Sequence, residues 1–208
     1  MKTLQLNSIT NFKFQTMKTM KTMKTMKTMK RCSMYALLAI AMIGCSDDDA
    51  TPEPVNEEEV ITTVILTLTP ESGEEVILTT IDLDGDGPDE PVTTVSGSFS
   101  ENTVYTGAAR FLNETETPAE EITDEVVEEA DEHQVFYTTT EGLNITTTYL
   151  DFDSNGNPLG VSITLETGEA SSGSLTVTLR HEPVKPNDGL DSAGGETDIA
   201  TSFDVSIQ

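Results

Sequence analysis

The sequence predicts a mainly β domain over residues 60–208, an antiparallel β-sandwich of the immunoglobulin-like or jelly-roll-like kind. Two observations predict it. Hydrophobic side chains recur at every second position, and short turns rich in glycine, asparagine, serine and proline separate these runs. Alternation turns successive side chains toward a core and toward solvent, as in a half-buried strand. Short strands at such spacing are typical of antiparallel sandwiches.

The alternating runs are rich in threonine, which favours a pleated, half-buried surface. The expected strands are 60–69, 143–149, 159–165, 175–179 and 199–207. The last is the most regular, because Ile199, Thr201, Phe203, Val205 and Ile207 fall on one face. The expected turns are 70–73, 84–87, 155–157 and 171–173.

One segment departs from the strand pattern. Thr117 is a capping residue type, Pro118 follows it, and Glu120 stands three residues after the cap. This order is typical of a helix start. Ile122 and Val126 then recur at helical spacing, as does Ala130. We therefore expect one short amphipathic helix at 118–131, packed on the sheet.

Charge is distributed very unevenly along the chain. All 37 acidic residues follow residue 44, and only Arg110, Arg180 and Lys185 oppose them there. Such a surface repels phosphates, so nucleic acid is not an expected partner. Residues 46–208 contain no cysteine, which excludes a disulfide, a zinc-thiolate cluster and a cysteine nucleophile in that domain.

The first 44 residues are typical of a signal peptide. A Thr-Met-Lys repeat over 16–30 precedes the apolar run 33–44, which is too short to span a membrane as a helix of about 20 residues. Residues 42–45 (Met-Ile-Gly-Cys) resemble a bacterial lipobox. The resemblance implies diacylglycerol on the Cys45 sulfur, cleavage before Cys45 and a further acyl chain on the new amine. The alternative is an ordinary signal peptide with a chance cysteine.

Residues 45–59 form the expected lipidated acidic tether between the signal peptide and the domain at 60–208. Ser46-Asp47-Asp48-Asp49 resembles the export signal of Bacteroidetes-type lipoproteins. That resemblance implies an outer-membrane lipoprotein, anchored by its lipid and facing the cell exterior. A plain acidic linker is the alternative.

Two acidic loops are candidate calcium sites. In the first, Asp82, Asp84 and Asp86 take positions 1, 3 and 5 of a calcium loop, Gly87 takes position 6, and Glu90 takes position 9. Carboxylates on alternate residues can converge on one hard cation. Thr93 stands at position 12, where a bidentate glutamate would complete the shell. The alternative is a solvated acidic turn.

The second loop has Asp151, Asp153 and Asn155 in the same positions, followed by Gly156. Here the turn of a β-hairpin is the simpler explanation, because Asn-Gly between alternating runs is a strong hairpin pattern.

The domain has two histidines, His133 and His181. With a carboxylate they could bind zinc or copper, although nothing in the sequence brings them together. The alternative places His133 at the helix C-terminus and His181 on the surface. Separately, Asp191-Ser192-Ala193 resembles a Bacteroidetes-type O-glycosylation acceptor, with Ser192 as the modified residue and an unmodified loop as the alternative.

No nucleophile, metalloprotease, phosphate-loop or dinucleotide motif is present in the sequence, so an enzyme is not expected. A carboxylate pair could hydrolyse glycosides, but with 37 acidic residues any chosen pair would be arbitrary. A hydrolase therefore remains only a remote alternative.

The chain resembles a family of small flavobacterial lipoproteins, often labelled type 1 periplasmic binding fold proteins. The resemblance lies in the leader and in residues 45–49, 79–91, 132–134, 159–160, 175–183 and 194–199. The label implies an α/β fold, whereas the strand pattern predicts β. The resemblance supplies no catalytic residues. We expect an acidic, lipid-anchored binding protein of the cell surface that binds a divalent cation, calcium being the candidate, or assists an outer-membrane receptor. A purely structural or adhesive envelope protein is the alternative.

Overall fold

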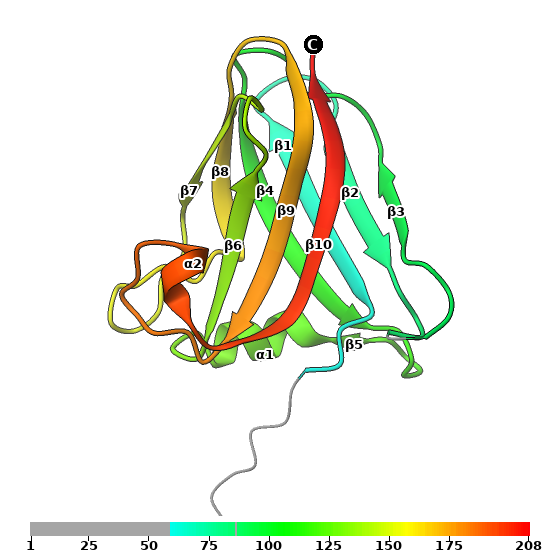
Figure 1. The fold of residues 1–208 in the computed structure, drawn as a ribbon, viewed down its shortest axis with the longest axis vertical. Helices are drawn as coiled ribbons and strands as arrows, with labels where there is room; N and C mark the ends of the chain where they lie inside the picture. Colours follow the sequence, from blue (N-terminus) through cyan, green and yellow to red (C-terminus); the bar gives the residue numbers. More distant parts are fainter. Residues whose placement is uncertain (1–58, 86) are drawn as a thin grey trace, which may run out of the picture. The chain divides into compact units, whose positions relative to one another are not determined.

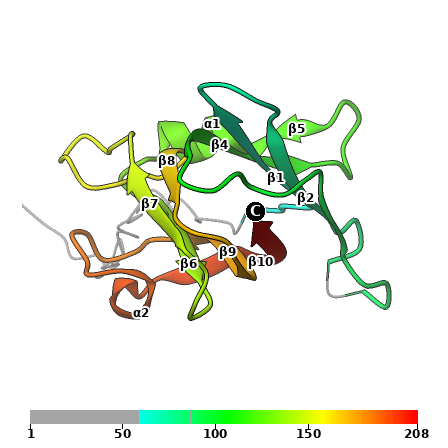
Figure 2. The same ribbon diagram turned by 90° about the horizontal axis from the view of Figure 1, so that it is seen from above.

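Two antiparallel sheets face each other across one hydrophobic core (Figures 1 and 2). The structure is a computed structural model that describes residues 59–85 and 87–208, all within the compact unit Pro52–Gln208. The predicted signal peptide, the lipidation site Cys45 and nearly all of the predicted tether lie outside the described residues. The described chain confirms the expected antiparallel β-sandwich with a short helix.

The larger sheet has seven strands, whose bounds are β1 Thr63–Pro70, β2 Val76–Ile81, β3 Val92–Val95, β4 Val104–Asn113, β5 Glu120–Glu121, β7 Ile145–Tyr149 and β8 Ser162–Thr167. Their order across the sheet is β3-β2-β1-β4-β8-β7, with the short β5 paired to the end of β4. Every pairing between these strands is antiparallel, which fits the short connections between most of them.

The smaller sheet has three strands, β6 His133–Thr139, β9 Ser171–His181 and β10 Glu196–Ile207, in the order β10-β9-β6. Backbone hydrogen bonds join each edge of the smaller sheet to a connecting segment of the chain. The Phe99 N–H donates to the Ser206 carbonyl at 2.8 Å on one side, and the Val135 N–H donates to the Leu159 carbonyl at 2.7 Å on the other. These contacts partly cover the edges of the smaller sheet.

The core lies between the inward faces of the two sheets. From the larger sheet it takes Val64, Leu66, Leu68, Val76, Leu78, Tyr105, Ala109, Phe111, Ile163 and Leu165, and from the smaller one Val135, Leu175, Val177, Leu179, Phe203, Val205 and Ile207. These positions alternate with exposed or half-buried ones along each strand, as the sequence pattern predicts. The C-terminal strand is buried at Thr201, Phe203, Val205 and Ile207, which confirms the predicted inward face.

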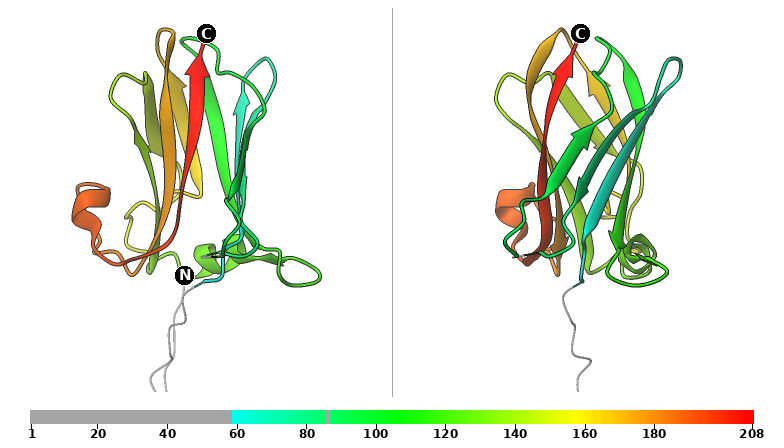
Figure 3. Two further views of the ribbon diagram at one scale, coloured as in Figure 1. Left: turned by 45° about the vertical axis from the view of Figure 1, so that its right-hand side comes forward. Right: turned by 90° about the vertical axis from the view of Figure 1, so that its right-hand side faces the viewer.

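The predicted helix at 118–131 is shorter than expected. The helix α1 covers Ile122–Glu128 and lies across one end of the sandwich (Figure 3). Its start is delayed because Glu120 and Glu121 pair with β4 as the extended strand β5, which excludes helical backbone there. Ile122 and Val126 are buried as predicted. A second helical turn, α2 Leu190–Ala193, was not predicted from the sequence.

The predicted turn at 171–173 is wrong. Ser171 is the first residue of β9, and the connection from β8 occupies residues 168–170 instead. Gly173 lies within the strand because the chain packs closely there, and a Cβ atom would lie 2.4 Å from the Thr140 hydroxyl. Gly173 therefore marks a close approach between two segments and not a turn of the chain.

Phe203 and Phe152 differ in burial, so the same change to alanine should affect the stability of the protein very differently at the two positions. Phe203 is 0% exposed and Phe152 is 54% exposed. Phe203→Ala should lower the free energy of unfolding by about 3–5 kcal/mol, because it leaves a cavity, while Phe152→Ala should cost less than about 1 kcal/mol. Chemical denaturation of both variants measures the difference. Equal losses would contradict the described core.

Candidate metal centre

The two histidines are brought together by strand pairing. His133 begins β6 and His181 ends β9, and the antiparallel register sets them directly opposite each other. The neighbouring inward pair is Val135 and Leu179, both 0% exposed. The histidines therefore continue the inner face of the sheet at the end where its apolar layers stop. Their ring centroids are 4.7 Å apart.

Asp198 joins them because the register of β10 shifts by one residue. Thr197 pairs with Arg180, but Ile199 pairs with Leu179, as at a β-bulge. A bulge turns the strand locally and re-aims a side chain. In an uninterrupted strand Asp198 would share the outward face with Ala200, which is exposed. Instead its carboxylate is 0% exposed and faces both imidazoles.

Two glycines precede this shift and allow the close approach of the backbone. Gly194 and Gly195 have φ angles of 61° and 68°, which side chains rarely tolerate. A Cβ atom on Gly195 would lie 2.2 Å from the His181 carbonyl oxygen. The Gly-Gly pair therefore lets the chain enter β10 directly beside His181, and this entry places Asp198.

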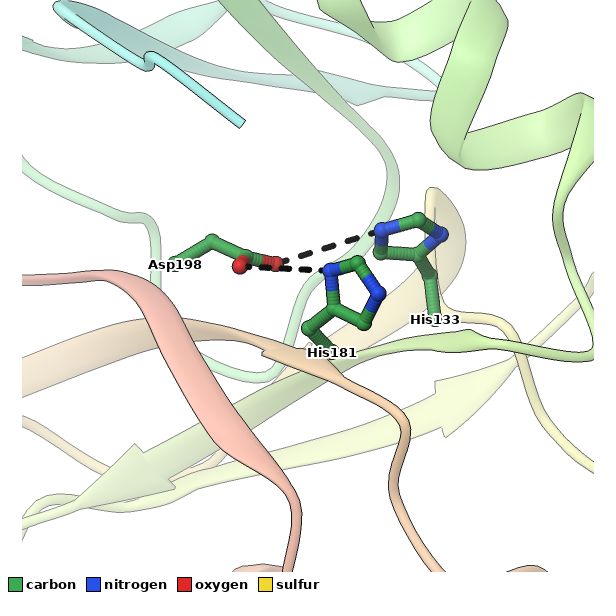
Figure 4. A group of neighbouring side chains, drawn as sticks. All are labelled: His133, His181 and Asp198. Atoms are coloured by element: carbon green, nitrogen blue, oxygen red, sulfur yellow. Dashed lines mark ion pairs between the residues drawn. The ribbon is translucent and has the colours of Figure 1, made fainter. Parts of the chain in front are cut away.

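The three side chains face one another across a small gap (Figure 4). One Asp198 oxygen lies 3.6 Å from His181 Nδ1, and the other lies 4.0 Å from His133 Nε2. One ligand atom from each residue can be chosen so that all lie within 4.8 Å of one another. The two measured separations are longer than an ordinary N–H···O hydrogen bond of about 2.7–3.2 Å.

His133 is held with one nitrogen turned toward this gap. Its Nδ1 lies 3.2 Å from the Glu129 carbonyl oxygen, so Nδ1 carries the proton and Nε2 keeps its lone pair. Nε2 is buried and has no hydrogen-bond partner among the described residues. The pKa of His133 is lowered from 6.5 to about 4, chiefly by burial. The hydrogen bond to Glu129 opposes this effect, and the nearby His181 and Lys185 add to it. The imidazole is neutral at pH 7.

Lys185 fixes the backbone around the centre. Its ammonium donates to the Ala130 carbonyl at 2.7 Å and to the His133 carbonyl at 2.5 Å, and it lies 3.5 Å from an Asp153 oxygen. Burial lowers the pKa of Lys185, although the Asp153 charge opposes that effect. Both charged groups are almost fully buried, so this contact ties three segments together beneath His133.

Acidic side chains lie around the histidines. A Glu59 carboxylate oxygen, a Glu129 carboxylate oxygen and a His133 ring nitrogen all lie within 4.8 Å of one another. Burial raises the pKa of Glu59 to about 7, and the charges of Glu125, Glu129 and Asp198 raise it as well, whereas His181 lowers it. The site therefore has a surplus of negative charge, which favours a cation.

The spacing of the donors suits a small divalent ion. A tetrahedral Zn²⁺ with bonds of about 2.0–2.2 Å separates its ligand atoms by about 3.3–3.6 Å. The observed 3.6 and 4.0 Å, each to a different oxygen of Asp198, lie at and just above the upper end of that range. Two imidazoles and one carboxylate form a donor set that suits zinc and copper, whereas calcium takes six to eight oxygens. The hydrogen bond from His133 to a carbonyl is the outer contact that usually orients a metal-binding imidazole.

Sequence reasoning missed one member of the centre and misplaced another. His181 was expected on the surface, and that alternative is wrong because its side chain is 7% exposed. His133 does contact the helix end through Glu129, but it begins a strand and is neutral. Asp198 was not singled out, because the alternation places it outward. The only pattern that could have found it is the Gly194-Gly195 pair ahead of the strand.

The first acidic loop gathers part of the predicted calcium set. Asp82, Asp84 and Glu90 line one surface cavity together with Asp89, which sequence reasoning did not single out. Asp84 accepts a hydrogen bond from the Asp89 N–H at 3.2 Å, as in an acidic turn. Asp86 lies outside the described residues. Calcium binding by this loop remains a prediction.

The second acidic loop is held by the protein's own donors. Asp151 accepts hydrogen bonds from the Gly160 and Ser162 N–H groups at 2.8 and 3.0 Å. Asp153 accepts from the N–H groups of Asn155 and Asn157 at 2.9 and 2.8 Å. The flanking strands β7 and β8 pair antiparallel, as a hairpin requires. These contacts explain the loop without an ion.

The predicted glycosylation site lies on an accessible turn. Ser192 is exposed within α2, and its hydroxyl contacts the Gly189 carbonyl at 3.1 Å and the Asp188 N–H at 3.0 Å. Modification of Ser192 remains a prediction.

Comparison of the chain with protein-family models, curated proteins and solved structures found no match. Among the described residues, no helix has the length and apolar character needed to cross a membrane.

The lowered pKa of His133 predicts a specific loss of stability in acid. In EDTA, the free energy of unfolding of the native chain minus that of His133→Gln should be constant above pH 6.5. Between pH 6.5 and 4 it should fall by about 3 kcal/mol, because the unfolded state takes up the proton and the folded state does not. Below pH 4 it should level off.

The measurement is denaturant unfolding of both proteins at each pH. The raised pKa of Glu59 acts in the opposite direction, since its protonation stabilises the folded state as the pH falls through 7. That contribution is shared by both proteins and cancels in the difference. A difference that does not change with pH would show that His133 is not held neutral.

Proposed function

We propose that this chain is a lipid-anchored protein of the bacterial envelope whose sandwich binds a divalent transition-metal ion, zinc or copper, between His133, His181 and Asp198. The observation that carries the proposal is His133 Nε2. It is buried, has no hydrogen-bond partner among the described residues, and faces the Asp198 carboxylate at 4.0 Å. An imidazole nitrogen with a free lone pair beside a carboxylate is poised to bind a metal.

Three further features support metal binding. The imidazole of His133 is neutral at pH 7, so no proton must leave before it coordinates. The donors belong to two paired strands and a bulge, which hold them more rigidly than loops would. The surrounding Glu59 and Glu129 supply a negative field that attracts a cation.

The proposed lipid anchor at Cys45 is supported by the sequence alone. The signal-like leader, the lipobox-like residues 42–45 and the acidic stretch after Cys45 support a lipidated protein of the outer membrane, exposed on the cell surface. A metal site on such a protein would capture ions outside the cell, either for storage or for transfer to an outer-membrane receptor.

Metal binding predicts a zinc-dependent rise in stability. The full chain with Cys32→Ser and Cys45→Ser, which has no thiol, is unfolded thermally in EDTA and then with zinc, copper or calcium. Zinc at about one hundred times its dissociation constant should add about 2.7 kcal/mol to the free energy of unfolding. Asp198→Asn and His181→Gln should remove the rise.

Asp84→Asn is the matched control, since it makes the same change in the acidic loop and should keep the zinc effect. The proposal fails if zinc has no effect on the parent chain, or if both Asp→Asn variants respond to zinc as the parent does. A rise with calcium alone that Asp84→Asn abolishes would place the cation in the 82–90 loop instead.

The anchor predicts a defined mature N-terminus. When the chain is expressed in a bacterium that processes lipoproteins, mass spectrometry of the membrane fraction should find Cys45 at the N-terminus, carrying diacylglycerol and a further acyl chain. Several acyl chains on one residue give stable membrane attachment, so Cys45→Ala should release the protein from the membrane. An unmodified mature terminus at another residue would contradict the anchor.

A further inference from the structure

Glu59, the first residue that the structure describes, lies beside the candidate metal centre. The segment that leads into β1 enters the sandwich at the end covered by α1 (Figures 1 and 3). The Glu59 carboxylate comes within 4.8 Å of a His133 ring nitrogen and of Glu129. Its charge also acts on Asp198 and His181.

The position of Glu59 is restricted by the residues that follow it. The Thr62 N–H donates to the Leu112 carbonyl at 2.9 Å, and the Thr62 hydroxyl accepts from the Glu114 N–H at 2.8 Å. These bonds fix the chain three residues after Glu59. The glutamate is half-buried, which also limits the directions its carboxylate can take.

The coordination number leaves room for one more ligand. Three protein ligands leave one position of a tetrahedral zinc ion open, as in catalytic sites, whereas four protein ligands close the site, as in structural ones. Glu59 and Glu129 each bring a carboxylate oxygen within 4.8 Å of a His133 ring nitrogen. Glu129 is exposed and its backbone carbonyl already binds His133, whereas Glu59 is half-buried and interacts with both Asp198 and His181.

We propose that Glu59 is the fourth ligand of the ion held by His133, His181 and Asp198, so that metal binding fastens the end of the tether to the sandwich. This inference rests on the proposed metal binding. A dication at this point also relieves the repulsion among the carboxylates of Glu59, Glu129 and Asp198. The closed shell leaves no position for an activated water, so the site binds metal without hydrolysing a substrate.

The test compares two glutamates of the same cluster. In the full chain with Cys32→Ser and Cys45→Ser, zinc affinity is measured by calorimetry for the parent, Glu59→Gln and Glu129→Gln. Loss of the Glu59 ligand should weaken zinc binding on the order of tenfold or more, as losses at metal sites do. Glu129→Gln, which removes a nearby charge but no proposed ligand, should weaken zinc binding less than Glu59→Gln does. Thermal unfolding in EDTA shows whether each variant is folded.

Amide hydrogen exchange supplies a second readout. Zinc should slow exchange at residues 59–62 in the parent and in Glu129→Gln but not in Glu59→Gln. Exchange around His133 and His181 should slow in all three proteins. Cobalt in place of zinc should give the strong visible absorption of a four-coordinate ion in the parent, and a weaker band in Glu59→Gln.

The outcomes separate the two proposals. If no protein of the set binds zinc, the proposed function fails and this inference fails with it. If Glu59→Gln binds zinc as tightly as the parent, and residues 59–62 are not protected, the metal centre stands and Glu59 is not its ligand. If Glu129→Gln alone loses affinity, the fourth ligand is Glu129 and the tether is not fastened.

Discussion

The register shift between Thr197 and Ile199 determines which face of the smaller sheet receives Asp198. Without it, the strand would put a carboxylate on the solvent side and leave two histidines opposite each other at the end of an apolar face. With it, a carboxylate is fully buried beside two imidazoles. Burying such a charge is expensive unless it is paired, hydrogen-bonded or coordinated. A cation held between this carboxylate and the two imidazoles would offset part of that cost.

The rest of the centre is arranged around that charge. Strand pairing sets His133 and His181 in register, and Gly195 lets the backbone pass close to the His181 carbonyl. Lys185 binds the carbonyl of His133 and not its ring, so it steadies the histidine and leaves Nε2 open. Each of these contacts acts on the position of a donor atom. Together they hold the three side chains of the proposed metal centre in place.

Much of the fold could be predicted from the sequence because the period of two is strong, and the inward faces of β1 and β10 follow it directly. The errors arose where tertiary pairing overrides local pattern. Glu120 and Glu121 pair with β4 and delay the helix, and Ser171 extends a strand where glycine and serine indicated a turn. The site was less predictable. His133 and His181 meet through long-range pairing, and a bulge reverses the orientation that alternation gives Asp198.

A carboxylate between two imidazoles can be balanced by protonating one of them or by binding a cation. Protonation of His133 is disfavoured, because burial lowers its pKa to about 4. Binding of a cation is favoured by the acidic side chains nearby. Glu59 and Glu129 both add negative charge, although Glu59, with a pKa of about 7, keeps its proton part of the time at neutral pH. Separations of 3.6 and 4.0 Å between the histidine nitrogens and Asp198 are too long for hydrogen bonds and close to those around a tetrahedral ion. Charge and distance are therefore both compatible with the proposed occupant, a small divalent metal ion.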